Sequence, residues 1–432
     1  MAQGNVVWIL GAGFSKPLGG PLLNELFRPG AVQQMADRFP KARYAAPQGP
    51  NTRARLLLEA VLWLYNYGID FDNGPVPMLF HTVSPEHGEK LWIDAEDFLD
   101  VLDLAARPPR ATPGTDEVKP SPLVRLVLQF LGHARPDGDI GRWLQEARKN
   151  PQGFLEAMNA EAQRLMVAQC SAFMLNADRE TERWAPFSKW GQSLKASDTV
   201  ITFNYDCAAE LVGEGKLVVA IDDATLKQGT QAKLLKLHGS TNWTKIRNKS
   251  HFQIDLNNGD FACLDDECFK WRCVGTPGPN KREITDYLKP VWDEARLAIH
   301  NAEAIVFVGY RFPPSDSDAR EKILGAIQEN ASHHLLLHTV LGPNISDEST
   351  SRLRGLLESR MSERRRLARV DRSSDEACRQ DANLRGGKTS AGHPASNLPL
   401  YYGIVPHPLY SQDFVSAPGN LFQPHHAPGW PS

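Results

Sequence analysis

Residues 6–21, VVWILGAGFSKPLGGP, constrain the fold of this chain more than any other segment. The apolar run 6–10 is typical of a parallel strand that is buried on both faces. Gly11 and Gly13 follow at once, and because glycine has no Cβ, the backbone there can approach a ligand closely. A helix beginning near Pro21 would direct its positive end toward the same gap. The segment therefore predicts a strand, a tight turn and a helix that together form a site for a phosphate-bearing nucleotide.

Two common nucleotide-binding motifs do not fit this segment. A P-loop needs Gly-Lys-Ser or Gly-Lys-Thr at its end, and no such triplet follows Gly13. The dinucleotide-binding fingerprint needs a third glycine at the position that Lys16 occupies. Taken alone, residues 11–13 therefore also fit a strand-to-helix turn that binds no ligand.

Length and charge narrow the class of protein. At 432 residues the chain can bury a large core and form two or three domains. Its formal net charge of -3 argues against direct binding of nucleic acid, although a local basic patch stays open. We find no signal peptide and no apolar segment long enough to span a bilayer, and the six cysteines form no evident disulfide framework. We therefore expect a cytoplasmic protein without membrane contact.

A helical pattern dominates the chain between the first strand and residue 195. The strongest apolar segments are residues 53–65, 96–104, 122–132 and 154–175. We interpret residues 30–195 as a large helical insertion that covers one side of the nucleotide cleft. The acidic stretch 92–97 is interpreted as the start of a helix, with the mouth of the pocket as the alternative.

Strand signals return after residue 198 and alternate with helical ones. Strands are expected at residues 199–203, 217–221, 234–237, 304–308 and 334–341, with helices at 206–212 and 316–328. Such alternation predicts an α/β fold, a Rossmann-like parallel sheet with helices on both faces. Ligands of these sheets bind at the carboxyl ends of the strands. The candidate loops are therefore residues 11–20, 204–206, 238–243 and 309–316.

The character of the chain changes near residue 346. Residues 352–370 are dense in arginine and predict an exposed helix, while Pro, Gly, Ser, Asn and His dominate from about residue 373. We expect a domain at residues 1–345, which contains the sheet and the insertion, and a C-terminal part at 346–432 that consists of the Arg-rich helix and a disordered tail.

Polar residues follow three of the expected strands. Asn204 and Asp206 come after the strand at 199–203, and Asp206 could simply cap the helix that follows. His238 stands beside a glycine at the end of an interior strand, where a general base would be placed, although a lone histidine in a turn is more often structural. Arg311 follows the strand at 304–308 and could equally face solvent.

Taken in order, these loops resemble the Sir2 (sirtuin) superfamily, and in particular its divergent SIR2-like branch of bacterial defence NADases. Gly11, Gly13, Ser15 and the triplet 19–21 match the opening GAGxSxxxGxP of the family. The later matches are TxNxD at residues 202–206, the catalytic His-Gly at 238–239, and the GYxFPxxD of the branch at 309–316. The match covers residues 5–30 and 198–345.

The resemblance implies that the protein binds NAD and cleaves the bond between nicotinamide and ribose. Gly11, Ala12 and Gly13 would present backbone N–H groups to the pyrophosphate, and the hydroxyl of Ser15 would add a donor. The family binds the adenosine side of the cofactor near Gly309, and the neighbouring cofactor-binding candidates are Tyr310 and Arg311.

The resemblance also assigns catalytic roles. Asn204 would orient the ribose or the attacking water, and Asp206 would contact the nicotinamide end or brace its loop. His238 would take a proton from a ribose hydroxyl or from water. No metal is required for this chemistry.

Departures from the family favour one reaction. Its deacylases carry a structural zinc on two Cys-x-x-Cys pairs, whereas Cys263, Cys268 and Cys273 have no such spacing. We therefore expect NAD hydrolysis, which by analogy would serve anti-phage defence through NAD depletion, gated by a partner protein or by homo-oligomer assembly. The alternatives are an NAD-dependent protein deacylase or ADP-ribosyltransferase, and a nucleotide-binding sensor without catalysis.

Overall fold

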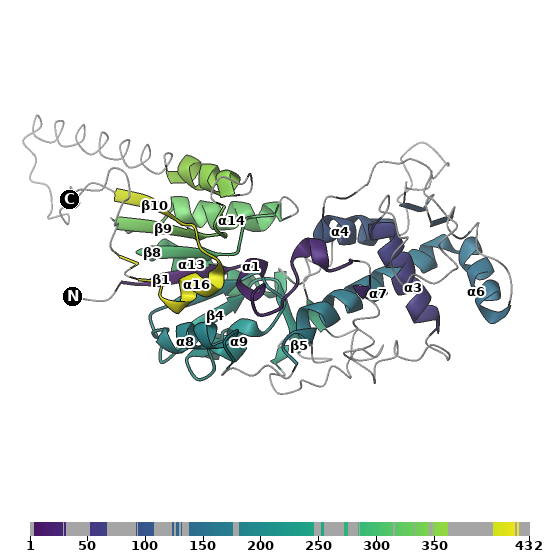
Figure 1. Ribbon diagram of the computed structural model, residues 1–432, viewed down its shortest axis with the longest axis horizontal. Coiled ribbons are helices and arrows are strands. Elements are labelled where there is room, and N and C mark those ends of the chain that lie inside the picture. Colours follow the sequence, from purple (N-terminus) through teal and green to yellow (C-terminus); the bar gives the residue numbers. More distant parts are fainter. Residues whose placement is uncertain are drawn as a thin grey trace, which may run out of the picture.

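A seven-stranded parallel sheet and a separate group of helices make up the computed structural model (Figure 1). The described residues are 4–28, 30–31, 52–66, 92, 94–107, 123–124, 127–128, 131, 138–175, 181–245, 252–254, 272–274, 284, 286–313, 316–332, 334–344, 348, 350–361, 401–419 and 421–422. Among them, no helix is both long and apolar enough to cross a bilayer.

The sheet has the strand order β10-β9-β8-β1-β2-β4-β3, and every neighbouring pair is parallel. Its strands are β1 (Val6–Leu10), β2 (Thr199–Thr202), β3 (Leu217–Val219), β4 (Ala232–Lys236), β8 (Ala304–Val308), β9 (His334–Val340) and β10 (Tyr401–His407). Strand β1 lies between β2 and β8, and all five of its residues are buried. The predicted Rossmann-like α/β fold is confirmed.

Helices cover the sheet in two groups. Helices α8 (Ala185–Ser193), α9 (Ala208–Val212) and α16 (Ser411–Ser416) form one group, in which α8 packs against both of the others. Helices α13 (Lys289–His300) and α14 (Ser317–Gln328) pack together, and in Figure 1 α14 lies beside β8 and β9, away from α8 and α9. The short helix α10 (Asp223–Leu226) joins β3 to β4.

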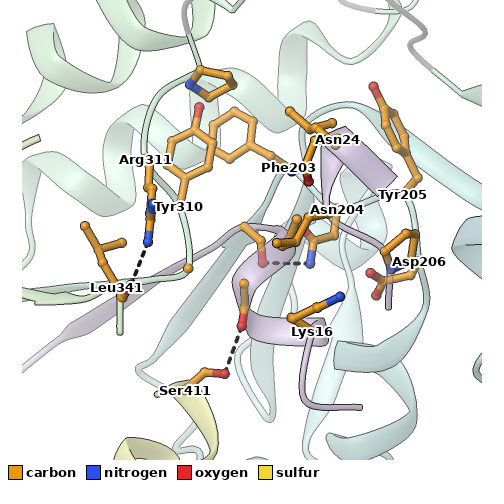
Figure 2. A pocket seen from close by; sticks show the side chains of 18 of the residues that line it. Lys16, Asn24, Phe203, Asn204, Tyr205, Asp206, Tyr310, Arg311, Leu341 and Ser411 are labelled. Carbon is orange, nitrogen blue, oxygen red and sulfur yellow. Dashed lines mark hydrogen bonds between the residues drawn. The ribbon is translucent and has the colours of Figure 1, made fainter. Parts of the chain in front are cut away.

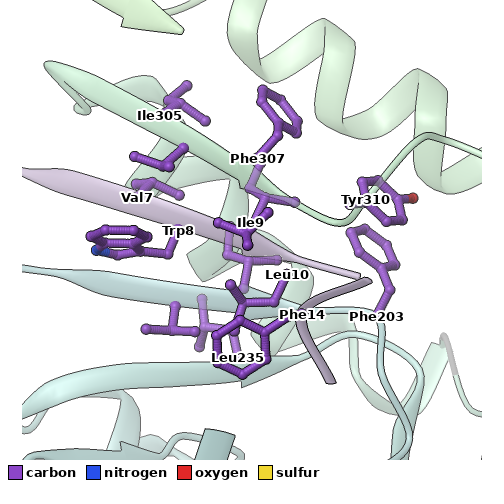
Figure 3. Packing of buried hydrophobic residues seen from close by; sticks show 14 of the residues in the cluster. Val7, Trp8, Ile9, Leu10, Phe14, Phe203, Leu235, Ile305, Phe307 and Tyr310 are labelled. Atoms are coloured by element: carbon purple, nitrogen blue, oxygen red, sulfur yellow. The ribbon is translucent and has the colours of Figure 1, made fainter. Parts of the chain in front are cut away.

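Aromatic side chains fix β1 to the first group of helices. Trp8 meets Trp190 of α8 edge-on at 5.4 Å between ring centroids and Phe414 of α16 at 6.4 Å. Phe14, which is 1% exposed, packs against Trp190 at 5.2 Å. Figure 3 shows Trp8 and Phe14 among the aliphatic side chains of the central strands. Such edge-to-face pairs add to the stabilisation from burial itself.

The helical insertion forms a lobe with its own hydrophobic core. Its helices are α3 (Thr52–Tyr65), α4 (Ala95–Ala105), α6 (Gly138–Lys149) and α7 (Pro151–Ala172), and α7 packs on the other three. Of the segment expected at 122–132, residues 123–124, 127–128 and 131 are described and are helical. The core of the lobe extends to Cys170, whereas α8 belongs to the core of the sheet. The lobe is therefore shorter than the predicted insertion.

Glu59 makes the stability of this lobe depend on pH. Burial raises the pKa of its carboxyl from 4.5 to about 7, against the opposing effect of the Arg55 guanidinium 3.1 Å away. Because the folded pKa lies above the unfolded one, the stabilisation is complete below about pH 4.5 and is lost as pH rises through 7. The free energy of unfolding of Glu59→Gln, relative to that of the wild type, should therefore rise by about 1–3 kcal/mol between pH 5 and pH 8. Urea unfolding at both pH values tests this, and an equal effect at both would contradict it.

The turn after β1 differs from its prediction. The expected helix near Pro21 is wrong: helix α1 (Ala12–Ser15) begins inside the Gly-Ala-Gly sequence, and the described residues 21–28 form a single 3-10 turn, η1 (Leu23–Glu25). A second difference concerns the expected loop at 238–243. After His238 the chain continues as β5 (Gly239–Lys245), which pairs antiparallel with β6 (Phe252–Ile254) and β7 (Arg272–Val274).

The expectation of a disordered C-terminal tail is wrong for residues 401–419 and 421–422. Strand β10 adds to the sheet beside β9, and α16 buries Phe414 against the core. The expected Arg-rich helix is described over residues 350–361, and it is not simply exposed, since Leu353 and Leu357 are fully buried. Of the predicted C-terminal part, residues 346–347, 349, 362–400, 420 and 423–432 lie outside the described residues.

Candidate functional site

The carboxyl ends of five parallel strands open onto one cavity of about 500 Å³ (Figure 2). Strands β1, β2, β4, β8 and β9 each end at it, as expected for the crevice of an open α/β sheet. The sequence-predicted residues that line it are Gly11, Ala12, Gly13, Asn204, Asp206, His238, Gly309, Tyr310 and Arg311. The helical lobe contributes Asp94, Glu96 and Cys170, so the cavity lies between the lobe and the sheet.

Glycines allow two loops to cross at the centre of this edge. The N–H of Gly11 donates to the carbonyl oxygen of Val308 at 3.0 Å, and that of Gly13 donates to Gly309 at 3.2 Å. A Cβ on Gly11 would lie 2.6 Å from the oxygen of Gly309. The amides of Gly11 and Gly13 are therefore engaged within the protein, which corrects their expected role as donors to a pyrophosphate. The two glycines instead let the β1 and β8 loops touch.

Asn204 is held by the chain around α1. Its Nδ2 donates to the carbonyl oxygen of Gly11 at 3.0 Å and to Oγ of Ser15 at 3.1 Å. The carbonyl oxygen of this side chain, Oδ1, has no hydrogen-bond partner among the described residues. Ser15 itself is 1% exposed and does not line the cavity. The predicted contact of Ser15 with a cofactor is therefore corrected: its hydroxyl braces Asn204.

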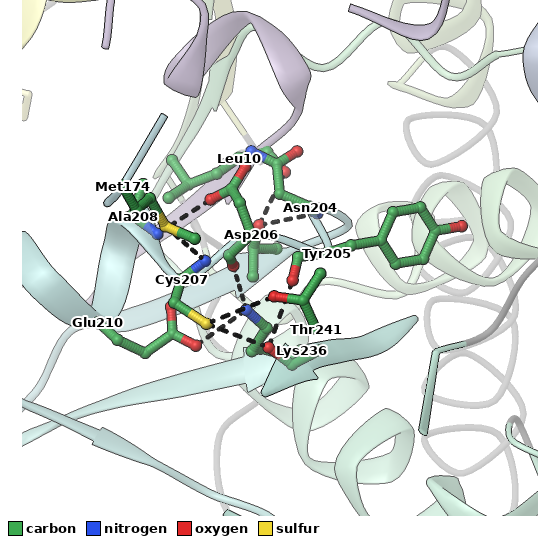
Figure 4. A network of polar contacts seen from close by, with 12 residues as sticks. Leu10, Met174, Asn204, Tyr205, Asp206, Cys207, Ala208, Glu210, Lys236 and Thr241 are labelled. Carbon is green, nitrogen blue, oxygen red and sulfur yellow. Dashed lines mark hydrogen bonds and ion pairs between the residues drawn. The ribbon is translucent and has the colours of Figure 1, made fainter. Parts of the chain in front are cut away.

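A buried polar network supports the loop after β2 (Figure 4). Oδ1 of Asp206 accepts from the N–H of Ala208 at 3.0 Å, so this aspartate braces its own loop. Lys236, the last residue of β4, is fully buried, and its Nζ donates to the backbone oxygen of Asp206 and to Oε1 of Glu210 at 2.9 Å. Burial raises the pKa of the Asp206 carboxyl, although Lys236 opposes this.

The charge state of Lys236 follows from the same network. Burial alone would lower the pKa of its ammonium group, but the negative charges of the neighbouring Glu210 and Asp206 raise it above its ordinary value. Burial raises the pKa of the Cys207 thiol to about 12, so this thiol stays protonated at neutral pH. The network therefore holds a charged lysine and an inert cysteine beneath the site.

His238 lies in an aromatic slot at the end of β4. The ring of Phe203 meets it edge-on at 5.1 Å between centroids, and Phe203 in turn stacks on Tyr310 at 4.2 Å. The imidazole is 3% exposed, and its Nε2 lies 3.2 Å from Oδ2 of Asp316, an ion-pair distance that falls outside hydrogen-bond geometry. Nδ1 of His238 is buried without a hydrogen-bond partner among the described residues.

Charged residues of both signs line the cavity. Lys16 lines it and forms an ion pair with Glu25 at 2.5 Å, and Arg311 donates to the carbonyl oxygen of Leu341 at 2.7 Å. Asp94 caps α4 by accepting from the N–H groups of the next turn and also lines the cavity, as does Glu96. Both interpretations of the acidic stretch 92–97, helix start and pocket wall, therefore hold.

The pKa values of two tyrosines in the cavity are raised by burial and by nearby negative charges. Burial raises the pKa of Tyr205 and of Tyr310 well above the ordinary value, and the charges of Glu96 and Asp316 raise both further. Both carboxylates line the cavity, one supplied by the lobe and one by the loop after β8. A positively charged group is favoured at this part of the cavity.

The C-terminal segment completes the wall. Tyr410 and Ser411 line the cavity, and Oγ of Ser411 donates to the carbonyl oxygen of Gly13 at 2.9 Å. Sequence reasoning missed these residues because no periodic pattern marks their segment. It also missed Lys236, whose signal is a charged residue inside the apolar run LLKL at 234–237.

The cysteines considered as ligands of a structural zinc lie in the middle of the chain. Cys263 and Cys268 lie outside the described residues, and Cys273 lies in β7. Within the part of the chain that the structure describes, no three His, Cys, Asp or Glu side chains gather in a group that could hold a metal ion.

Comparison with known proteins does not assign this chain to a family. No family model matches this chain, and no curated protein matches it in sequence. The resemblance to the Sir2 superfamily therefore depends on the motifs themselves and stays a prediction.

Proposed function

We propose that the protein hydrolyses NAD at the bond between nicotinamide and ribose. The observation that carries this proposal is the convergence of Asn204, His238 and the crossing of Gly11 and Gly13 with Gly309 around one cavity. These are the residues at which the chain resembles NAD-cleaving sirtuins. The volume of about 500 Å³ is within the range of small-molecule sites.

The charges of the cavity suit a ligand with two different ends. Lys16 and Arg311 would attract the diphosphate, whereas Glu96 and Asp316 would favour the positively charged nicotinamide ring. The same carboxylates would stabilise the positive charge that develops on the ribose as the glycosidic bond breaks. Binding energy of this kind, which grows toward the transition state, is what accelerates a reaction.

Two side chains would orient and deprotonate the attacking water. The free Oδ1 of Asn204 accepts a hydrogen bond from the attacking water, and His238 removes its proton. The water oxygen bonds to C1′ of the ribose, and nicotinamide leaves with the electron pair of the broken C–N bond. The products are nicotinamide, ADP-ribose and a proton.

The wider role in this proposal comes from the resemblance alone. A cytoplasmic NAD hydrolase would deplete NAD in an infected bacterial cell and so limit phage growth. A partner protein or assembly of several copies would activate it.

Incubation of the purified protein with NAD, followed by chromatography of the products, tests the reaction. We expect nicotinamide and ADP-ribose from the wild type, and a loss of at least about 10²-fold in Asn204→Ala and in His238→Ala. Lys289→Ala, on the outer helix α13, is the matched control and should keep the wild-type rate, because its ammonium group is exposed and pairs with Asp293 among the residues that the structure describes.

Other products would contradict hydrolysis in defined ways. Nicotinamide release that depends on an added acyl-lysine peptide, in step with its deacylation, would indicate a deacylase. If the assembled protein binds NAD and the NAD is recovered intact, the protein would be a nucleotide sensor. Unchanged release in both variants would move the chemistry away from this cavity.

A further inference from the structure

We infer that Asp316 is a positioning residue that holds the imidazole of His238 in one orientation and one tautomer. The inference rests on the proposed function, because it assigns His238 the work of a base. Its observation is the separation of 3.2 Å between Nε2 of His238 and Oδ2 of Asp316, with side chains that are 3% and 2% exposed. Both groups lie at the wall of the proposed site.

Asp316 stands at the N-cap position of a helix, but its side chain does not cap that helix. It is the N-cap residue of α14, where an aspartate ordinarily accepts from the N–H groups of the first turn. Its side chain makes no capping hydrogen bond. By contrast, Asp94 at the start of α4 accepts from the N–H groups of both Glu96 and Asp97. One oxygen of the Asp316 carboxylate, Oδ2, instead lies 3.2 Å from Nε2 of His238.

Residues 309–313, which precede Asp316 in the chain, contain two positions with an unusual backbone conformation. Gly309 has a φ of 66° and Phe312 a φ of 51°, and Phe312 is the one non-glycine residue with positive φ in the described part of the chain. The guanidinium of Arg352 donates to the carbonyl oxygen of Phe312, and the N–H of Asp316 donates to that of Pro313 at 3.1 Å. Backbone strain of this kind is retained at functional sites when the surroundings enforce it.

The chemistry follows from which ring nitrogen faces the carboxylate. The carboxylate that lies 3.2 Å from Nε2 favours the tautomer with its proton on that nitrogen, which leaves the lone pair on Nδ1. Both ring nitrogens are buried, and neither meets hydrogen-bond geometry with a described residue. Nδ1 then takes the proton from the attacking water, and Asp316 stabilises the imidazolium that forms. The proton leaves to solvent after the products. Phe203 packs edge-on against the ring at 5.1 Å between centroids.

Asp316→Asn tests the inference, because asparagine keeps the volume and removes the charge. We expect kcat to fall by about 10²- to 10⁴-fold with little change in KM. A ¹⁵N NMR spectrum of the ring nitrogens of His238, assigned by its loss in His238→Ala, should show the proton on Nε2 in the wild type. In Asp316→Asn we expect a mixture of tautomers. This spectroscopic signal does not depend on turnover.

Asp318→Asn is the matched control. Asp318 lies on the same helix, its side chain is 73% exposed, and it pairs with Lys322 at 2.8 Å, so neither kcat nor the spectrum should change. Identical tautomer populations in the wild type and Asp316→Asn would overturn the inference. A tautomer shift without nicotinamide release in any variant would support the positioning role and would instead contradict the proposed hydrolysis.

Discussion

Replacing Lys236 with methionine is expected to lower the free energy of unfolding by about 3–5 kcal/mol. The ammonium group is fully buried and contacts the backbone oxygen of Asp206 and the carboxylate of Glu210. Its removal leaves a carboxylate that is 6% exposed without its cation. The loop that carries Asn204 loses a support at the same time, so nicotinamide release should fall as well. Urea unfolding and the product assay measure the two effects.

Two further variants separate the charge effect from general damage. Lys236→Met combined with Glu210→Gln should be less destabilised than Lys236→Met alone, because no unpaired charge stays buried. Lys227→Met removes the cation of an exposed i,i+4 pair with Asp223 and should cost no more than about 0.5 kcal/mol. A similar loss in Lys227→Met and Lys236→Met would contradict the account of the network.

Gly309→Ala is expected to destabilise the protein by about 3–5 kcal/mol and to abolish NAD binding. Gly309 has a φ of 66°, which L residues rarely adopt, and an added Cβ would lie 2.4 Å from the backbone of Gly13. The β8 loop would have to leave the β1 loop, and the cavity that both line would change shape. Thermal unfolding and NAD titration check the prediction.

Gly355→Ala is the control for this substitution. Gly355 lies within the helix at residues 350–361, and its added Cβ would meet no atom within 4 Å. Alanine is the better helix former, so we expect a gain of about 0.5–1 kcal/mol and unchanged NAD binding. If Gly309→Ala were equally harmless, the close crossing of the two loops would be contradicted.

The sheet was predictable because its strands are short apolar runs that end at clear turn signals. The predicted β8 has the observed bounds, since AIVFV is followed directly by Gly309. Strand β10 was not predictable from the same rule. Gly403 and Pro406 interrupt its sequence, and an edge strand tolerates such residues because it has a partner on one side only.

The turn after β1 shows where a local signal fails. Pro21 is a good first residue for a helix, but the chain forms α1 at Ala12–Ser15 instead, where Phe14 can pack on Trp190 and Phe187. Tertiary packing thus decides the position of this short helix, and no capping residue marks it in the sequence.

The candidate site was predictable where a residue directly follows a strand. Asn204 and His238 could be placed because parallel strands bring their carboxyl ends to one edge. Glu96 and Asp316 lie in the segments 92–97 and 309–316 that the sequence offered for the site, but it assigned neither residue a role, since each stands at the start of a helix, where an acidic residue is ordinarily interpreted as part of the helix terminus. Their approach to the cavity depends on how the lobe packs on the sheet.

A crystal structure of His238→Ala with NAD tests the central claim most directly, because this variant should bind NAD without cleaving it. We predict intact NAD in the cavity between the lobe and the sheet, its nicotinamide ribose beside Asn204 and residue 238, and its diphosphate near Lys16. NAD bound elsewhere on the protein, or a cavity that stays empty at saturating NAD, would contradict the account.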